Sequence, residues 1–139
     1  MRAVRQAHTG PELVVRRLLH GLGLRFRLHR RGLPGTPDII LPKHRTAIFV
    51  HGCFWHRHAG CAKATTPKTR AVFWCEKFDR NVFRDQETER ALASAGWRVL
   101  TVWECETNRP ETLREKLHDA FKRDEHEDGA IHVVGADRP

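Results

Sequence analysis

The sequence lacks any apolar run that approaches the roughly 20 residues needed for a membrane-spanning helix. It also shows no apolar secretory core at its N-terminus, no internal repeat and no low-complexity tract. We therefore expect a cytoplasmic protein that needs no membrane. At 139 residues the chain is too short for two ordinary domains, so residues 1–139 are expected to form one domain.

Acidic residues are scarce in the first part of the chain. Residues 1–31 contain eight arginines and a single acid, Glu12, and the whole chain has 25 Lys+Arg against 17 Asp+Glu, a net charge of +8. This excess favours a polyanionic partner, with nucleic acid as the leading candidate and the nucleoid as the place where it would be met. Residues 110–139 contain eight acids against five bases, so the positive surface is expected on the N-terminal part.

Cysteines are few, and in a reducing compartment four of them indicate metal binding rather than disulfides. Tetrahedral Zn²⁺ takes four soft ligands and stabilises loops that have little apolar content. We predict a closed structural zinc site. The alternatives are that Cys53 is a core thiol, or that His56 rather than His58 is the ligand. Cys75 is expected to be a packed thiol. The predicted ligands are Cys53, His58, Cys61 and Cys105.

Hydrophobic periodicity predicts the order helix, three strands, helix, strand, helix. The predicted helices cover residues 9–22, 72–77 with 81–95, and 108–121, and the predicted strands cover 24–28, 38–41, 46–51 and 97–103. Residues 1–8 are expected to be an arm and 122–139 a charged linker and tail, with a short edge strand at 130–134. This order predicts an α/β fold with a mixed central sheet flanked by helices.

An aspartate opens one predicted strand and a histidine closes its hairpin partner. Because a short hairpin pairs those two ends, Asp38 and His51 are expected to be neighbours. Pro-Asp pairs are common in turns, but a carboxylate that enters a buried strand is costly unless it coordinates or pairs. In a nucleic-acid-binding protein such a carboxylate indicates Mg²⁺-assisted hydrolysis, with His51 and His56 within reach as proton-transfer groups. Ordinary loop histidines are the alternative.

Two further assignments stay open. Glu12 completes a T-x-x-E capping box with Thr9, and spacing alone favours the box over a catalytic role. Phe54 and Trp55 lie between predicted zinc ligands. They form either the small core of that loop or a wedge that stacks into DNA.

The motifs are LPGTPD at residues 33–38, IFVHGCFWH at 48–56, FWCEK at 73–77, NV and RD within 81–85, and GWRVL and VWEC within 96–105. Together they resemble the very short patch repair (Vsr) endonuclease family over nearly the whole chain. The resemblance implies a restriction-endonuclease-like fold with a structural zinc. It also implies a Mg²⁺-dependent nick 5′ of the thymine in a T:G mismatch left by deamination of 5-methylcytosine.

The resemblance also implies catalytic roles. Asp38 matches the magnesium-binding aspartate of the family, and His51 and His56 match its two catalytic histidines. Glu12 matches a glutamate that works with them. The usual threonine before the first histidine is Val50 here, and its backbone carbonyl still serves as a magnesium ligand.

Further roles concern zinc and DNA. The four cysteine and histidine ligands predicted above match the family's zinc ligands, although one more residue separates His58 from Cys61 than in the usual pattern. Phe54 and Trp55 match aromatics that wedge into DNA, and Met1 falls where a methionine enters from the other groove. We expect a monomer that acts on T:G duplex DNA, with mismatch-repair proteins as further partners. A related restriction or defence nuclease, or a non-catalytic zinc module that binds DNA, is the alternative.

Overall fold

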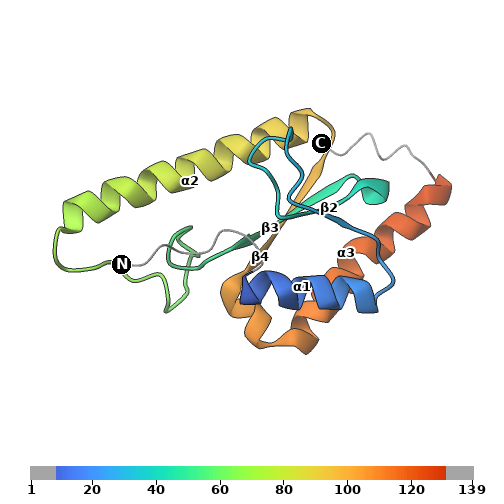
Figure 1. Cartoon of the computed structure of the whole chain (residues 1–139), viewed down its shortest axis with the longest axis horizontal. Helices are drawn as coiled ribbons and strands as arrows, with labels where there is room; N and C mark the ends of the chain where they lie inside the picture. Colours follow the sequence, from blue (N-terminus) through green and yellow to red (C-terminus); the bar gives the residue numbers. More distant parts are fainter. Residues whose placement is uncertain (1–8, 131–139) are drawn as a thin grey trace.

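The computed structural model describes residues 9–130, and side chains up to residue 122. The elements are α1 (Gly10–Gly21), β1 (Arg27–Leu28), β2 (Ile39–Leu41), the 3₁₀ turn η1 (Pro42–His44), β3 (Thr46–His51), α2 (Ala71–Ser94), β4 (Arg98–Trp103), the 3₁₀ turn η2 (Glu104–Asn108) and α3 (Pro110–Ala130). Their order confirms the predicted succession of helices and strands (Figure 1). The predicted arm at residues 1–8, with Met1, and the tail beyond residue 130 lie outside the described residues.

The four strands form one mixed sheet in the order β1-β2-β3-β4. The first two pairings are antiparallel, with Ile39 opposite Ile48, and β3 and β4 are parallel, with Ile48 opposite Leu100. Parallel neighbours need a long crossover connection, and α2 supplies it. The predicted mixed sheet is therefore confirmed.

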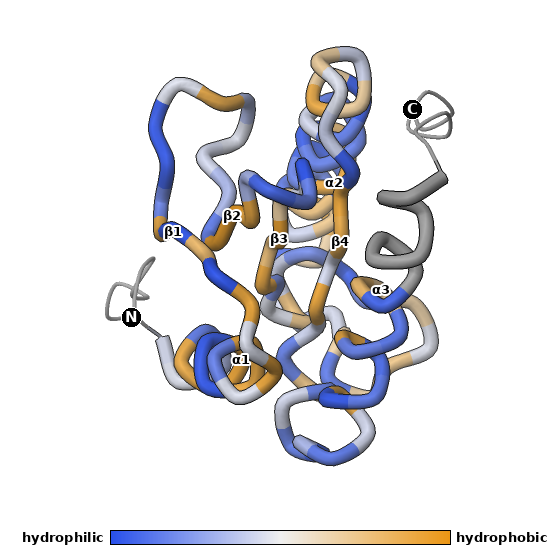
Figure 2. The backbone as a smooth tube through the Cα atoms, turned by 90° about the vertical axis from the view of Figure 1, so that its right-hand side faces the viewer, coloured by the Kyte–Doolittle hydropathy of each residue, from blue (hydrophilic) through white to orange (hydrophobic). Residues whose placement is uncertain are grey.

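Helices cover both faces of the sheet. Side chains alternate between the two faces along each strand, so neighbouring strand residues pack against different helices. On one face, Ile39 and Ile48 pack with residues of α1 and α3 such as Val15 and Leu117. On the other face, Ile40 and Ala47 pack with Leu92 of α2 and its neighbour Trp97. Figure 1 shows α2 on the side opposite α1 and α3, and Figure 2 shows that apolar residues concentrate along β3 and β4.

Local sequence signals fix the first helix where the pattern predicted it. The Thr9 hydroxyl accepts a hydrogen bond from the backbone N–H of Glu12 at 3.3 Å, and a proline lies in the first turn. Val15 and Leu19 are fully buried. The helix ends before Gly23, which takes a positive φ of 78° that glycine adopts without strain.

Some predicted boundaries are wrong. The two helical pieces at 72–77 and 81–95 are one helix, since Phe78 between them is buried and anchors α2. The helix α3 continues through residues 122–129, where a linker was predicted, and includes Ala130, the first residue of the predicted edge strand. Only Arg27–Leu28 of the predicted strand 24–28 pair as a strand. Among residues 9–130, no helix combines the length and apolar character of a membrane span.

Candidate active site and metal cluster

The candidate residues gather at one end of the sheet. β1, β3 and β4 end there, and β2 begins there, because β2 is antiparallel to its neighbours while β3 and β4 run together. Asp38 precedes β2, His51 closes β3 and Cys105 follows β4. The hairpin register thus brings Asp38 and His51 to the same end, as the sequence predicted.

Asp38 is held in a setting that opposes its charge. Its Oδ2 accepts a hydrogen bond from the backbone N–H of Val50 at 2.8 Å. The pKa of Asp38 is raised to about 6, chiefly by burial and also by the nearby Glu12 carboxylate, against the lowering effects of the Val50 N–H, His29 and His56. The carboxylate is still mostly ionised at neutral pH and is poorly solvated, which favours binding of a cation.

The rings of two histidines stack at the end of the sheet where Asp38 lies. The rings of His51 and His56 are nearly parallel, with centroids 3.8 Å apart. His51 is only 8% exposed, and burial, followed by the charge of His56, lowers the pKa of His51 to about 4. His56 Nδ1 lies 2.7 Å from Oδ2 of Asp85 on α2. A carboxylate only accepts, so Nδ1 of His56 carries the hydrogen and Nε2 is left for another partner. Because its pKa is about 4, His51 is neutral at pH 7 and can accept a proton.

Glu12 is buried, 2% exposed, and its carboxylate faces the same end of the sheet. His29 Nε2 lies 3.0 Å from Glu12 Oε2, and Arg16 lies 3.4 Å from the same oxygen. One ligand atom from each of Glu12, His29 and Asp38 lies within 4.8 Å of the others. The capping interaction of Thr9 with the Glu12 backbone and a role for the Glu12 carboxylate in the site are thus compatible.

Sequence reasoning did not assign Asp85 or His29 to the site. Asp85 is 29 residues from His56 along the chain, and only the position of α2 joins them. A signal for His29 was present, since it follows a predicted strand that pairs with the strand opened by Asp38. The backbone N–H of His29 donates to the Asp38 carbonyl at 2.9 Å.

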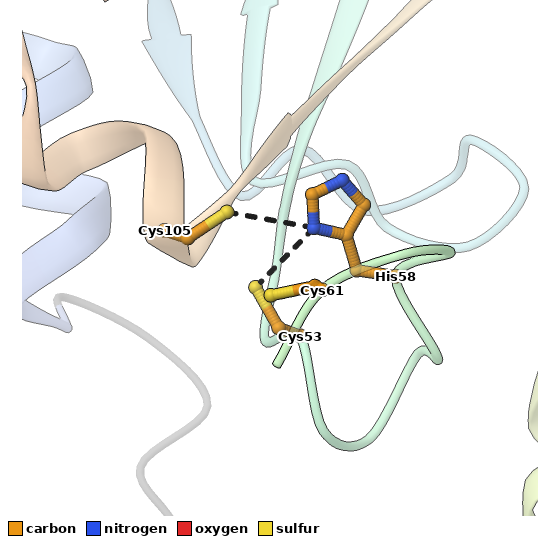
Figure 3. A group of neighbouring side chains, drawn as sticks. All are labelled: Cys53, His58, Cys61 and Cys105. Carbon is orange, nitrogen blue, oxygen red and sulfur yellow. Dashed lines mark hydrogen bonds between the residues drawn. The ribbon is translucent and has the colours of Figure 1, made fainter. Parts of the chain in front are cut away.

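The second group of side chains is the predicted zinc cluster (Figure 3). Its four donor atoms lie within 4.8 Å of one another, and His58 Nδ1 lies 3.7 Å from Cys53 Sγ and 3.4 Å from Cys105 Sγ. Ligands at about 2.0–2.3 Å from a tetrahedral Zn²⁺ lie about 3.3–3.8 Å from each other, so the spacing fits. His58 rather than His56 faces the cluster, and Cys53 belongs to it while being buried. The cluster consists of Cys53, His58, Cys61 and Cys105.

Both halves of the metal cluster are held by other contacts. The Arg57 guanidinium donates to the carbonyls of Phe54, Ala64 and Thr65, which holds together the chain before and after Cys61. Glu106 accepts from the backbone N–H of Trp103 and from Lys116 of α3, which fixes the turn that carries Cys105. Cys75 is exposed on α2, so the prediction of a packed thiol is wrong.

Phe54 and Trp55 are half-buried and belong to an aromatic cluster with Trp74 and Phe78 of α2. Phe54 lies 5.2 Å from Phe78, and Trp55 lies 5.8 Å from Trp74, between ring centroids. The Arg57 guanidinium covers the Phe78 ring at 3.9 Å. The pair is therefore packed against α2 and also partly open to solvent, beside His56.

The fold and the site together define a class. The fold is similar to that of the homing endonuclease I-Bth0305I catalytic domain, with a TM-score of 0.59, 22% sequence identity, and coverage of 83% of this chain and 96% of that chain. A mixed sheet with helices on both faces and a buried carboxylate at one end is thus a restriction-endonuclease-like fold.

Comparison of sequences gives the family. Residues 1–63 match the family model of the DNA mismatch endonuclease Vsr. The chain is 51% identical over 119 residues to the type II nicking enzyme V.XorIIP of Xanthomonas oryzae pv. oryzae, covering 86% of this chain and 87% of that protein. It is 45% identical over 119 residues to the DNA mismatch endonuclease Vsr of Escherichia coli, covering 86% and 73%. The chain belongs to the Vsr family, and the protein is therefore a DNA endonuclease.

Proposed function

We propose that this endonuclease nicks DNA 5′ of the thymine in a T:G mismatch, as part of the repair of deaminated 5-methylcytosine, in a Mg²⁺-dependent reaction in the cytoplasm. The observation that carries the proposal is that Asp38 and the stacked rings of His51 and His56 lie at the same end of the sheet, near enough for His56 to affect the pKa of Asp38. Membership in the Vsr family supports the choice of substrate.

The donors at Asp38 fit a hard cation. Mg²⁺ is held by one or two carboxylates together with water and phosphate oxygens, and Asp38 and Glu12 offer carboxylate oxygens close to each other. Asp38, with the backbone carbonyl of Val50, would hold the ion. A bound Mg²⁺ would supply charge stabilisation at the phosphate and a water of lowered pKa.

The two histidines would then move protons. His51 is neutral at pH 7, so it can accept a proton from the attacking water. His56 is oriented by Asp85 through Nδ1, which leaves its Nε2 for proton transfer with the substrate. One of the two rings would accept the proton of the attacking water, and the other, in its protonated form, would supply a proton to the leaving oxygen.

The test is a nicking assay on a T:G duplex beside matched T:A and C:G duplexes, with and without Mg²⁺. We expect a nick in the T:G duplex alone, in the strand that contains the mismatched thymine, and only when Mg²⁺ is present. Asp38→Asn should bind DNA normally and fail to nick, because an amide holds the cation poorly and leaves the basic surface intact. Near-normal cleavage by this variant would refute the assignment of Asp38.

A related specificity is the second candidate, because several relatives are type II nicking enzymes. In that case the enzyme would nick a different DNA structure with the same residues. Nicking of the matched duplexes at a rate similar to the T:G duplex would favour it.

A further inference from the structure

The group of Glu12, His29 and Asp38 contains one member that the proposed chemistry leaves without a task. His29 is a quarter exposed at its side chain, and it lies between two acids from different elements. Its Nε2 is 3.0 Å from one carboxylate oxygen of Glu12 and 3.2 Å from the other.

The backbone of His29 is held just as firmly. Its N–H donates to the carbonyl of Asp38 at 2.9 Å, which continues the pairing of β1 with β2 by one residue. Its φ of 44° lies in the left-handed region, which costs a histidine some free energy and persists only where the surroundings impose it. His29 therefore joins the Glu12 side chain on α1 to the Asp38 backbone at the end of the sheet where β2 begins.

Arg16 also contacts Glu12, and it differs from His29 in one respect. It lies four residues along the same helix, with its guanidinium 3.4 Å from a single oxygen of Glu12. An (i, i+4) contact within α1 cannot fix where α1 lies relative to β2. His29 contacts both oxygens and is itself paired with Asp38.

We propose that His29 is a positioning residue that holds the Glu12 carboxylate beside Asp38, so that the two carboxylates can share one divalent cation. The inference rests on the proposed function, because it takes Asp38 as the cation ligand. Hydrogen bonds to ligating carboxylates orient them, and losing such a partner lowers metal affinity or activity by about 10–100-fold.

The test compares His29→Ala with His29→Gln in the zinc-loaded full chain. Glutamine keeps an N–H that can donate to Glu12, and both variants are L-residues that bear the same left-handed backbone. Binding of Mn²⁺ to the DNA-free protein, measured by electron paramagnetic resonance, and the Mg²⁺ concentration for half-maximal nicking are the readouts. We expect His29→Ala to weaken Mn²⁺ binding by about 10–100-fold and to raise the Mg²⁺ concentration for half-maximal nicking by a similar factor. His29→Gln should stay much closer to the wild type in both measurements. Affinity for DNA without Mg²⁺ should not change.

Two controls make the outcome decisive. His118→Ala removes an exposed histidine that lies beside Asp119 on α3, and it should match the wild type. Asp38→Asn should abolish Mn²⁺ binding. Retained Mn²⁺ binding in Asp38→Asn would overturn the proposed function and this inference together. If Asp38→Asn loses Mn²⁺ but His29→Ala keeps it, or if His29→Gln is as weak as His29→Ala, only the role of His29 is overturned. A loss of DNA affinity in His29→Ala with unchanged Mn²⁺ binding would also overturn it.

Discussion

Asp38 is a residue whose partly buried setting costs the folded protein stability. Its pKa is about 6 in the folded state against 3.8 for the unperturbed group, chiefly because the carboxylate is buried. Between these two values the folded state binds more protons than the unfolded state. The free energy of unfolding contributed by this group is therefore greatest below pH 3.8 and is lost as the pH rises through 6.

This shift predicts a stabilised variant. In Mg²⁺-free buffer, Asp38→Asn should be more stable than the wild type by up to about 3 kcal/mol at pH 7.5, since one unit of pKa corresponds to 1.36 kcal/mol. The gain should shrink as the pH is lowered from 7 to 5. Urea unfolding of both proteins across this range measures it.

Because His51 also titrates, the quantity to measure is the difference in free energy of unfolding between Asp38→Asn and the wild type. Its lowered pKa of about 4 has the opposite sign, because the unfolded state binds the proton first as the pH falls below 6.5. That contribution is common to both proteins and cancels in the difference. A gain that is constant with pH would contradict the account of Asp38.

At the residue scale, sequence alone identified the groups that belong to compact motifs. Asp38, His51 and His56 were found because a hairpin and a short loop bring near neighbours in sequence together. The contacts of Asp85 with His56 and of His29 with Glu12 were missed because each joins two different elements, although the place of His29 beside β1 could be seen in the sequence. The rotational phase of α2 and the approach of α1 to the sheet decide those contacts, and neither is encoded in a local pattern.

At the element scale, the loop after β3 and the turn after β4 carry the predicted zinc ligands. Loss of one ligand should therefore lower metal content and stability together. Cys105→Ser and Cys53→Ser should each lower both the zinc content and the melting temperature, since metal binding and folding share free energy. Cys75→Ser is the matched control, because this thiol is exposed on α2 and lies outside the cluster. Metal analysis and thermal unfolding on the same samples check it. Active wild-type protein without zinc would refute the site.

A further prediction concerns the aromatic cluster, whose half-buried state combines the two roles considered for it. Replacing both Phe54 and Trp55 with alanine should lower the melting temperature, by less than the about 3–5 kcal/mol that each fully buried aromatic would represent. It should also reduce binding to T:G duplex more than to T:A, because stacking into DNA is worth about 1–3 kcal/mol per base.

The matched control for that variant is Phe83→Ala, an aromatic on α2 that is 61% exposed. It should change neither the melting temperature nor the DNA preference. Equal weakening towards T:G and T:A duplexes by the double variant would show that Phe54 and Trp55 serve the fold alone.

The elements themselves were largely predictable, and their ends were not. Within residues 9–130, periodicity found the three α-helices and the four strands because each buries an apolar face. It divided α2 near Phe78, since the charged residues around this position resemble a break. It ended α3 at residue 121 because the apolar face stops there, whereas the backbone continues as helix to Ala130.

At the scale of the whole molecule, the uneven charge of the chain sets its response to salt. Exposed arginines cluster on β1 and the loop that follows it, including Arg27, Arg30 and Arg31. Replacing Arg30 and Arg31 with alanine should lower the slope of log affinity against log salt by about 0.9 for each lost phosphate contact. The ratio of T:G to T:A binding should stay the same.

Arg90→Ala is the matched control for charge, because Arg90 is exposed on α2 and paired with Glu87. Its salt slope should equal that of the wild type. Titrations at several salt concentrations, for matched and mismatched duplexes, separate the two variants. An unchanged slope in the Arg30 and Arg31 variant would place the DNA on another surface.

The metal cluster spans two distant stretches of chain, and this has a consequence for how the protein is made. Three ligands leave the ribosome together by Cys61, and the fourth, Cys105, follows 44 residues later (105 minus 61). At about 5–20 residues per second, the nascent chain offers a three-ligand site for about 2–9 s before it can be closed. Closure needs β4 beside β3 in the correct register, because a slip of one residue would turn the end of β4 to the other face. Zinc supply in the cell would therefore act as a checkpoint on assembly, and chains that stall there would be substrates for chaperones and proteases.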